Sequence, residues 1–151
     1  LPPPSKRGDV FRQAALKALD TLSRNPDGFF LMIEGSNIDK AAHSSNLEEM
    51  MEELLDFDRT AGAVLDWASK HPGTLVVITA DHNTGAFALT GGSREKGEIT
   101  ARFGSGSHDG VAVPVYAFGA GSGDFTGIYE NTDIFNKIMN ALKKGADKPV
   151  R

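Results

Sequence analysis

Three short segments of the chain place histidine and carboxylate residues close together. Asp39 and His43 are four residues apart, Asp81 and His82 are adjacent, and His108 follows a stretch of glycine and serine. Imidazole nitrogens and carboxylate oxygens are donors that zinc and other hydrolytic metal ions accept. Each segment follows or lies near a predicted strand end, where open α/β sheets place their sites. The sequence therefore predicts a metal-dependent hydrolase.

Each segment also has a simpler explanation when it is taken alone. Asp39 and His43 lie on one face of a helical segment, but the dipole at a helix N-terminus favours an acid without any metal. Asp81 can accept hydrogen bonds within a turn, and His108 can be an ordinary surface histidine. We assign His71, which precedes a proline at a predicted helix C-terminus, a structural role. The metal prediction therefore depends on the three segments together.

The hydrophobic pattern predicts helices and strands in the order of an α/β protein. A capping box of Ser45 or Asn46 with Glu48 or Glu49 begins a long amphipathic helix. Continuous apolar runs predict strands that are buried on both faces, as in a parallel sheet, and the order strand, helix, strand predicts a right-handed crossover. Glu34 ends the first run and is either a ligand or the first solvated residue. The predicted helices are 10–22, 46–68 and 134–143, and the predicted strands are 29–33, 74–79, 86–90 and 113–119.

Size and composition indicate enough chain for one domain over residues 1–151. The formal net charge of −4, with 16 basic and 20 acidic residues, argues against a nucleic-acid partner. No apolar run reaches the roughly 20 residues that a membrane span needs, and the chain does not begin with a signal segment. Because the chain has no cysteine, any metal ion would be bound by nitrogen and oxygen donors.

Two stretches are predicted to lack regular structure. Residues 1–8 contain three successive prolines and are predicted to be a lead-in or linker. Residues 91–107 are polar and contain glycine, which predicts a surface loop or a weak hairpin. No Gly-x-Ser-x-Gly nucleophile elbow occurs, and the glycine-rich segments lack the context of a dinucleotide-binding loop. The sequence therefore favours neither serine catalysis from this chain alone nor dinucleotide binding.

Several segments closely resemble those of the alkaline phosphatases. They occur in the family's order, at residues 33–43, 77–82, 107–108, 113–119 and 130–134. The resemblance extends over most of the chain, from about residue 28 to residue 142. The related phosphoglycerate mutases that need no cofactor share the Thr-Ala-Asp-His sequence, but not the Glu-Gly-x-x-Ile-Asp segment.

The resemblance implies a site with two zinc ions and one magnesium ion. Asp39, His43 and His108 resemble the three protein ligands of the first zinc, which activates the attacking water. Asp81 and His82 resemble two ligands of the second zinc, which activates a serine nucleophile. The resemblance therefore implies one complete set of zinc ligands and one incomplete set.

Two further residues match the family's site, and other parts of that site have no counterpart. Glu34 resembles a magnesium ligand, and Lys40 matches a bacterial variant in which a lysine approaches the phosphate. The family's serine nucleophile, its shared metal-binding aspartate and its phosphate-binding arginine come from the first half of the chain. None of those motifs occurs here. We therefore expect the C-terminal part of a zinc-dependent alkaline phosphatase, with the prolines near the start marking where a longer chain was cut.

This interpretation implies hydrolysis of phosphate monoesters through a phosphoserine intermediate by the full-length protein, and an inactive isolated chain. It also implies an incomplete three-layer α/β/α fold with a mostly parallel sheet. From the family alone we expect the missing N-terminal half as a partner, a homodimer of the full-length protein, and a periplasmic or extracellular location. One alternative is another metalloenzyme of the same superfamily, such as a phosphomutase, sulfatase or phosphodiesterase. The other is a metal-binding module without catalysis.

Overall fold

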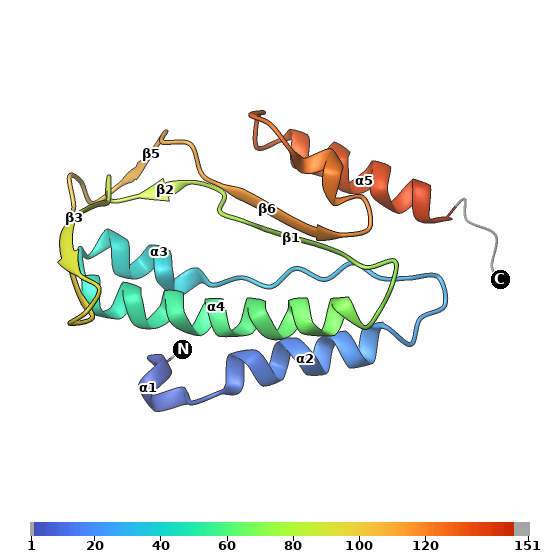
Figure 1. Ribbon diagram of the computed structural model, residues 1–151, viewed down its shortest axis with the longest axis horizontal. Coiled ribbons are helices and arrows are strands. Elements are labelled where there is room, and N and C mark those ends of the chain that lie inside the picture. The colour runs from blue at the N-terminus through green and yellow to red at the C-terminus, as the bar shows by residue number, and fades with distance from the viewer. Residues whose placement is uncertain (1, 147–151) are drawn as a thin grey trace.

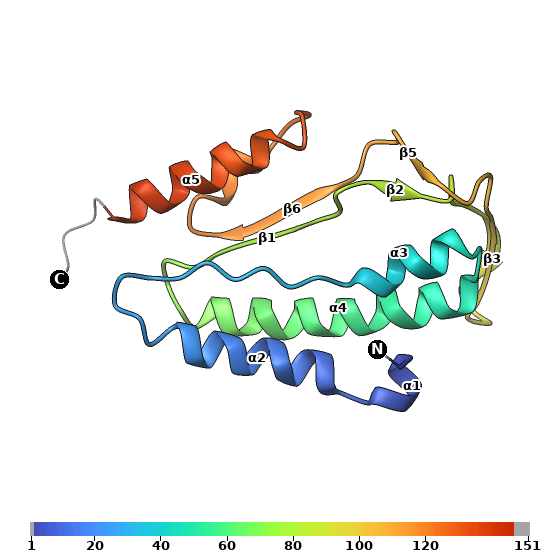
Figure 2. The same cartoon turned by 180° about the vertical axis from the view of Figure 1, so that it is seen from behind.

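Helices lie on both sides of a narrow pair of strands in the computed structural model, which describes residues 2–146 (Figure 1). The pair consists of β1 (Leu75–Thr79) and β6 (Val115–Gly119). Helices α2 (Val10–Leu22) and α4 (Leu47–Ser69) lie on one side of the pair, and α5 (Asp133–Ala146) lies on the other, as the view from behind also shows (Figure 2). The helical and sheet layers of an α/β/α fold are therefore present.

The remaining elements are short. β2 pairs with β5, and β3 forms a hairpin with β4. Residues 91–107 are therefore not a continuous loop; the hairpin alternative is the one that forms, with its turn at residues 94–97. The short elements are α1 (Pro4–Arg7), α3 (Ser36–His43), β2 (Asn83–Thr84), β3 (Ala88–Ser93), β4 (Glu98–Arg102), β5 (His108–Asp109) and the 3-10 helix η1 (Ser122–Phe125).

The long helix α4 begins where the capping pattern predicts. Asn46 is its N-cap, and the side-chain oxygen of Asn46 accepts a hydrogen bond from the backbone N–H of Glu49 at 3.2 Å. The Asn46 amide also donates to the Glu49 carboxylate at 3.0 Å. These bonds satisfy one of the free N–H groups of the first helical turn and orient the Glu49 side chain. No helix among residues 2–146 is long and apolar enough to cross a membrane.

A small hydrophobic cluster joins α3 to the start of α4. Ala41 and Ala42 of α3 and Met50 of α4 are buried there. Phe87 and Phe103, which flank the β3–β4 hairpin, pack against them. Because alanine side chains are short, α3 can approach α4 closely. The cluster thereby holds α3, α4 and the β3–β4 hairpin together.

The direction of the strands differs from the prediction. β1 and β6 are antiparallel, with Leu75 opposite Gly119 and Thr79 opposite Val115. The other two strand pairs among residues 2–146 are antiparallel as well. The expected mostly parallel sheet is therefore wrong for the strands that pair within the described part of the chain. A continuous apolar run indicates that both faces of a strand are covered, and helices can cover both faces of a strand of either direction.

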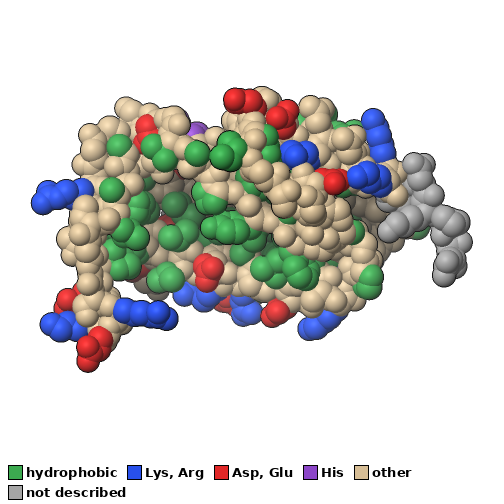
Figure 3. All heavy atoms as spheres, turned by 45° about the horizontal axis from the view of Figure 1, so that its top comes forward, with side chains coloured by type: hydrophobic (Ala, Val, Ile, Leu, Met, Phe, Trp, Pro, Cys, Tyr) green, Lys and Arg blue, Asp and Glu red, His purple; other side chains and the backbone are tan. Residues whose placement is uncertain are grey.

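The first predicted strand, residues 29–33, is extended but joins no strand pair among residues 2–146. It runs beside β1 in the same direction, on the side of β1 that faces α4 (Figures 1 and 2). Alternate side chains are half-buried, whereas Phe30 and Met32 are 63% and 76% exposed. Figure 3 shows further hydrophobic side chains in the middle of one face of the molecule. The predicted crossover therefore lacks its first hydrogen-bonded strand, although the order of its parts is as expected.

The start of the chain corrects the prediction of an irregular lead-in over residues 1–8, of which residue 1 lies outside the described part of the chain. Pro4 begins the helical turn α1, and proline suits that position because its φ angle is helical and no N–H partner is needed there. The Arg7 guanidinium lies 2.7 Å from a Glu53 oxygen and 2.6 Å from an Asp56 oxygen, both on α4. This buried cluster of charges attaches α1 to the long helix.

Candidate metal centre

The helix α3 presents the first two candidate ligands. Asp39 and His43 are one turn apart, as the spacing predicts, and the His43 Nε2 atom lies 3.4 Å from an Asp39 oxygen. Gly35, the N-cap of α3, has no side chain where a β-carbon would lie 2.7 Å from the Phe57 ring of α4. The absence of a side chain at Gly35 therefore lets the helix start close against α4.

His108 joins these two residues from a distant part of the chain. Its Nε2 atom lies 3.4 Å from the other Asp39 oxygen and 3.0 Å from His43 Nε2. All three candidate ligand atoms lie within 4.8 Å of one another. The side chains of Asp39, His43 and His108 are 37%, 39% and 50% exposed, so the cluster is open to small molecules from solvent.

The donor set and its spacing fit a zinc ion. Two donor atoms bound to one zinc at about 2.0–2.1 Å in tetrahedral geometry lie roughly 3.3 Å apart. The two Nε2 atoms lie 3.0 Å apart, and each lies 3.4 Å from a different oxygen of Asp39. One Asp39 oxygen and both Nε2 atoms lie within 4.8 Å of one another. The His43 Nδ1 atom lies 2.8 Å from the carbonyl oxygen of Gly106, which can only accept a hydrogen bond, so Nδ1 carries the proton. The free lone pair of neutral His43 is therefore on Nε2, the atom that faces the cluster.

The second candidate pair borders the first cluster but is not part of it. Asp81 and His82 follow β1, and the His82 Nε2 atom lies 3.3 Å from an Asp81 oxygen. The His82 ring stacks on the His108 ring with 3.5 Å between their centroids. The Asp81 side chain is 85% exposed and the His82 side chain 27% exposed. The pair therefore offers one oxygen and one nitrogen beside the three-residue cluster.

Two residues that the sequence interpretation did not include support these side chains. Thr84 is buried, and its hydroxyl contacts Asp39 at 2.6 Å and the His82 Nδ1 atom at 3.2 Å. Burial raises the pKa of Asp39, but the Thr84 hydrogen bond and the neighbouring histidines outweigh burial, so that the pKa is lowered overall. Asp109, next to His108, accepts hydrogen bonds from three different residues.

Either residue could have been noticed in the sequence. Thr84 is two positions after His82, and side chains two apart in an extended strand point to the same side. Asp109 directly follows the candidate ligand His108 and precedes Gly110, and an aspartate before a glycine is common in turns.

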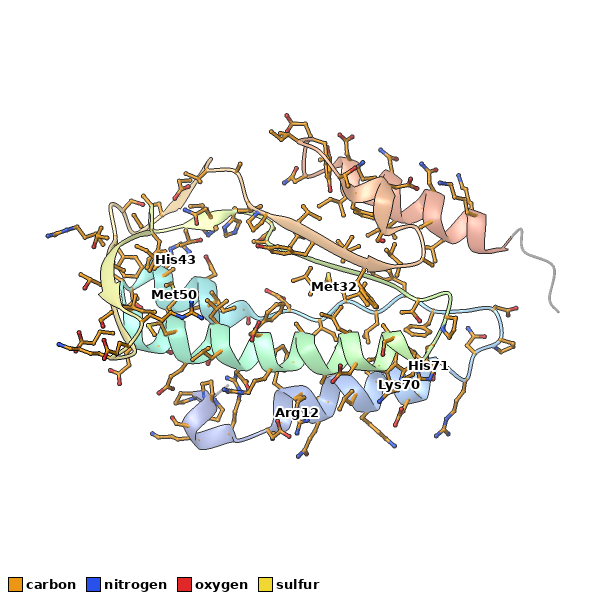
Figure 4. The ribbon with its side chains drawn as sticks, viewed as in Figure 1. Arg12, Met32, His43, Met50, Lys70 and His71 are labelled. Atoms are coloured by element: carbon orange, nitrogen blue, oxygen red, sulfur yellow. The ribbon has the colours of Figure 1, made fainter. Side chains whose placement is uncertain are left out.

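The other predicted site residues lie outside the cluster. Glu34 is exposed just before α3 and is not part of the three-residue group. Lys40 is exposed on α3, between the two ligand candidates of that helix. His71 lies at the opposite end of α4 from His43 (Figure 4), where its ring stacks on Trp67 and its Nδ1 atom is 2.7 Å from the Trp67 carbonyl oxygen. The structural role assigned to His71 is confirmed.

Comparison with known proteins identifies the family. The family model described as "Alkaline phosphatase" matches residues 8–102, which is more than half of the chain. The chain belongs to the alkaline phosphatase family. It is 32% identical over 157 residues to alkaline phosphatase H of Pseudomonas aeruginosa, which covers 92% of this chain and 33% of that protein. It is 31% identical to an alkaline phosphatase of Escherichia coli, over 93% of this chain and 34% of that protein.

Solved alkaline phosphatases share the fold. The enzyme from the Antarctic bacterium TAB5 is 38% identical, with a TM-score of 0.87 over 95% of this chain and 44% of that chain. A variant of the TAB5 enzyme, with Mg bound in a site called M3, has a TM-score of 0.83 and 40% identity over 91% of this chain and 42% of that chain. These likenesses confirm a partial alkaline phosphatase fold. The chain spans less than half the length of these alkaline phosphatases.

Proposed function

We propose that the chain supplies a metal-binding part of the active centre of a phosphatase that hydrolyses phosphate monoesters. The observation that carries this proposal is the convergence of one carboxylate and two imidazoles, on Asp39, His43 and His108, in a chain of the alkaline phosphatase family. These three residues would bind the first zinc ion. Asp81 and His82 would contribute two ligands to the second.

The chemistry of the donor atoms supports this assignment. Bound zinc ions supply charge stabilisation at the oxygens of a phosphoryl group in transfer and lower the pKa of an oxygen nucleophile. The chain's own residues hold the ligand atoms in place: the Gly106 carbonyl orients His43, and the Thr84 hydroxyl bonds to Asp39. Lys40 is an exposed cation beside Asp39 on α3, so it would attract a phosphate group.

The rest of the site would come from the part of the full-length protein that this chain does not contain. We expect that part to supply the serine that forms the phosphoserine intermediate and the further ligands of the second zinc and of magnesium. Glu34 would be the magnesium ligand of this chain. The isolated chain is therefore expected to bind metal but not to turn over substrate. The homodimer and the periplasmic or extracellular location of the full-length protein also remain predictions from the family.

The experiment that tests the proposal measures zinc binding by the purified chain. We expect the parent chain to bind zinc, by calorimetry and by metal analysis after dialysis. His43→Ala and His108→Ala each remove one of three ligands, so each should weaken binding by more than the roughly 10–100-fold that loss of an outer hydrogen-bond partner costs. His71→Ala is the matched control, because it removes a histidine at the other end of α4.

Two results would contradict the proposal. Equal zinc affinity in the parent, His43→Ala and His108→Ala would show that the cluster does not bind the ion. Turnover of p-nitrophenyl phosphate by the isolated chain, abolished by a chelator and by His108→Ala, would contradict its expected inactivity.

A further inference from the structure

Thr84 is the residue that connects the two sets of candidate ligands. It is 8% exposed, and its hydroxyl touches Asp39 of the first set and His82 of the second. Its strand β2 also pairs Thr84 directly with His108 of β5. We propose that Thr84 is a positioning residue that orients ligands of both zinc ions through this one hydroxyl. The inference depends on the proposed function for the identity of the metal.

The hydroxyl has one proton, and the structure indicates where it goes. Asp39 can only accept a hydrogen bond when it is ionised, and it lies 2.6 Å from the Thr84 oxygen, a distance typical of a hydroxyl that donates to a carboxylate. The Thr84 proton is therefore directed at Asp39. Its oxygen is left as an acceptor for the second neighbour.

That second neighbour is the His82 Nδ1 atom, 3.2 Å away. Because the Thr84 proton is already directed at Asp39, a hydrogen bond to His82 requires the proton to be on His82 Nδ1. A neutral imidazole protonated at Nδ1 has its lone pair on Nε2. His82 Nε2 is the atom that lies beside the Asp81 carboxylate, 3.3 Å away. The Thr84 hydroxyl thus places the lone pair of His82 on Nε2, the ring nitrogen that faces Asp81.

The same logic applies to the first cluster, but with a different acceptor. The Gly106 carbonyl fixes the proton of His43 on Nδ1 at 2.8 Å. Each set of ligands therefore contains one histidine with its proton on Nδ1, held there by a hydrogen-bond acceptor. The lone pair on Nε2 of that histidine is then available to a metal ion. Of these two partners, the Gly106 carbonyl and the Thr84 hydroxyl, it is the Thr84 hydroxyl that also bonds to a ligand of the other set, so its loss should disturb both sets together.

The test uses three single variants of the chain. Thr84→Val keeps the branched shape of the side chain and removes the hydroxyl, whereas Thr84→Ser keeps the hydroxyl. Thr60→Val is the control, because Thr60 is also buried, at 2% exposed, and its hydroxyl bonds to the Asp56 backbone carbonyl in α4. The tautomer of His82 is read in the metal-free chain from the ¹⁵N shifts of its ring nitrogens, at about pH 8.5, which is well above the ordinary pKa of a histidine in model peptides. Zinc affinity is then measured by competition with a chromophoric chelator.

We expect the parent, Thr84→Ser and Thr60→Val to hold the His82 proton on Nδ1 and to bind zinc with similar affinity. Thr84→Val should lose the Nδ1 preference and bind zinc roughly 10–100-fold more weakly. A parent chain with the proton on Nε2 of His82 overturns the inference without any variant. So does Thr84→Val with parental zinc affinity or a parental tautomer. A parent chain that binds no zinc contradicts the proposed function instead, and the tautomer then still decides whether Thr84 orients His82.

Discussion

The buried charges around Arg7 allow a quantitative prediction about how the start of the chain is held. Both terminal nitrogens of Arg7 donate to Glu53, at 2.8 and 2.7 Å, and one of them also donates to Asp56 at 2.6 Å. The side chains of Arg7, Glu53 and Asp56 are only 7%, 5% and 4% exposed. Arg7→Ala would leave two buried carboxylates without their main cation. Removing one partner of a buried ion pair costs about 3–5 kcal/mol.

For a chain of this length, each kcal/mol lowers the melting temperature by about 2–4 °C. We therefore expect Arg7→Ala to melt roughly 6–20 °C below the parent in a thermal scan followed by circular dichroism. The control is Arg12→Ala in α2, which breaks the ion pair of Arg12 with Asp9. These two side chains are 43% and 40% exposed, so water and salt screen the pair and its loss should change the melting temperature little.

The same substitution in a second variant distinguishes the loss of an attractive ion pair from the cost of burying carboxylates without a cation. In Glu53→Gln/Asp56→Asn the neighbours of Arg7 are neutral, so adding Arg7→Ala leaves no buried carboxylate without a cation. The added cost should therefore be smaller than in the parent, which a double-mutant comparison measures. Equal melting temperatures for Arg7→Ala and Arg12→Ala would refute the reasoning and would return residues 1–8 to the status of a linker.

Two other predictions concern the β1–β6 pair and α5. Gly119 and Gly73 both have positive φ, +90° and +98°, but only at Gly119 would a β-carbon lie 2.2 Å from a backbone oxygen, whereas Gly73 faces open space. In both alanine variants the unfavourable backbone conformation should lower the free energy of unfolding by roughly 1–2 kcal/mol. Gly119→Ala should lower it clearly more, because its β-carbon would also clash with the backbone oxygen. Equal denaturation midpoints for the two variants would contradict this. The Lys144 side chain donates to Asp124 at 2.8 Å and holds the pKa of that carboxyl below its ordinary value of 3.8. The pair should therefore stabilise the fold at pH values above 3.8, and its contribution should be lost as the pH falls through the lower pKa of the folded state. Lys144→Ala should raise the pKa of Asp124 in an NMR titration. An unchanged pKa would exclude the pair as the cause of the lowering.

Local patterns in the sequence predict the three longest helices, α2, α4 and α5, well, because each of these helices is specified by residues that are near one another. The spacing of apolar residues and the cap at Asn46 place α4 within a residue of its observed start. Strand direction is different, because it depends on which distant segment becomes the neighbour. The apolar runs at residues 29–33 and 74–79 look alike in sequence, yet only the second joins a strand pair among residues 2–146.

The candidate site divides in the same way. Asp39 and His43 are one helical turn apart, so their proximity follows from the sequence once α3 forms. His108 is 65 residues from His43. The placement of the three segments near strand ends predicted one shared site, but only the family resemblance grouped His108 with Asp39 and His43 as ligands of one ion. The Asp81 and His82 pair was predicted from its position after β1, but its stacking on His108 was not. That these residues bind metal in the two assigned sets, one of three ligands and one of two, stays a prediction that zinc titration can test.

His108 lies in a very short strand pair, to which its neighbour Asp109 adds further hydrogen bonds. β2 and β5 are two residues long, and so short a pair of strands is at best marginally stable by itself. Asp109 adds hydrogen bonds from the backbone N–H of Val111 at 3.1 Å, the Asn83 amide at 2.9 Å and the backbone N–H of Ala86 at 2.9 Å. The Val111 N–H and then Asn83 lower the pKa of Asp109, so it remains an ionised acceptor in neutral solution. Asp109, which is not a candidate ligand, therefore links the strand that carries Thr84 to the strand that carries His108.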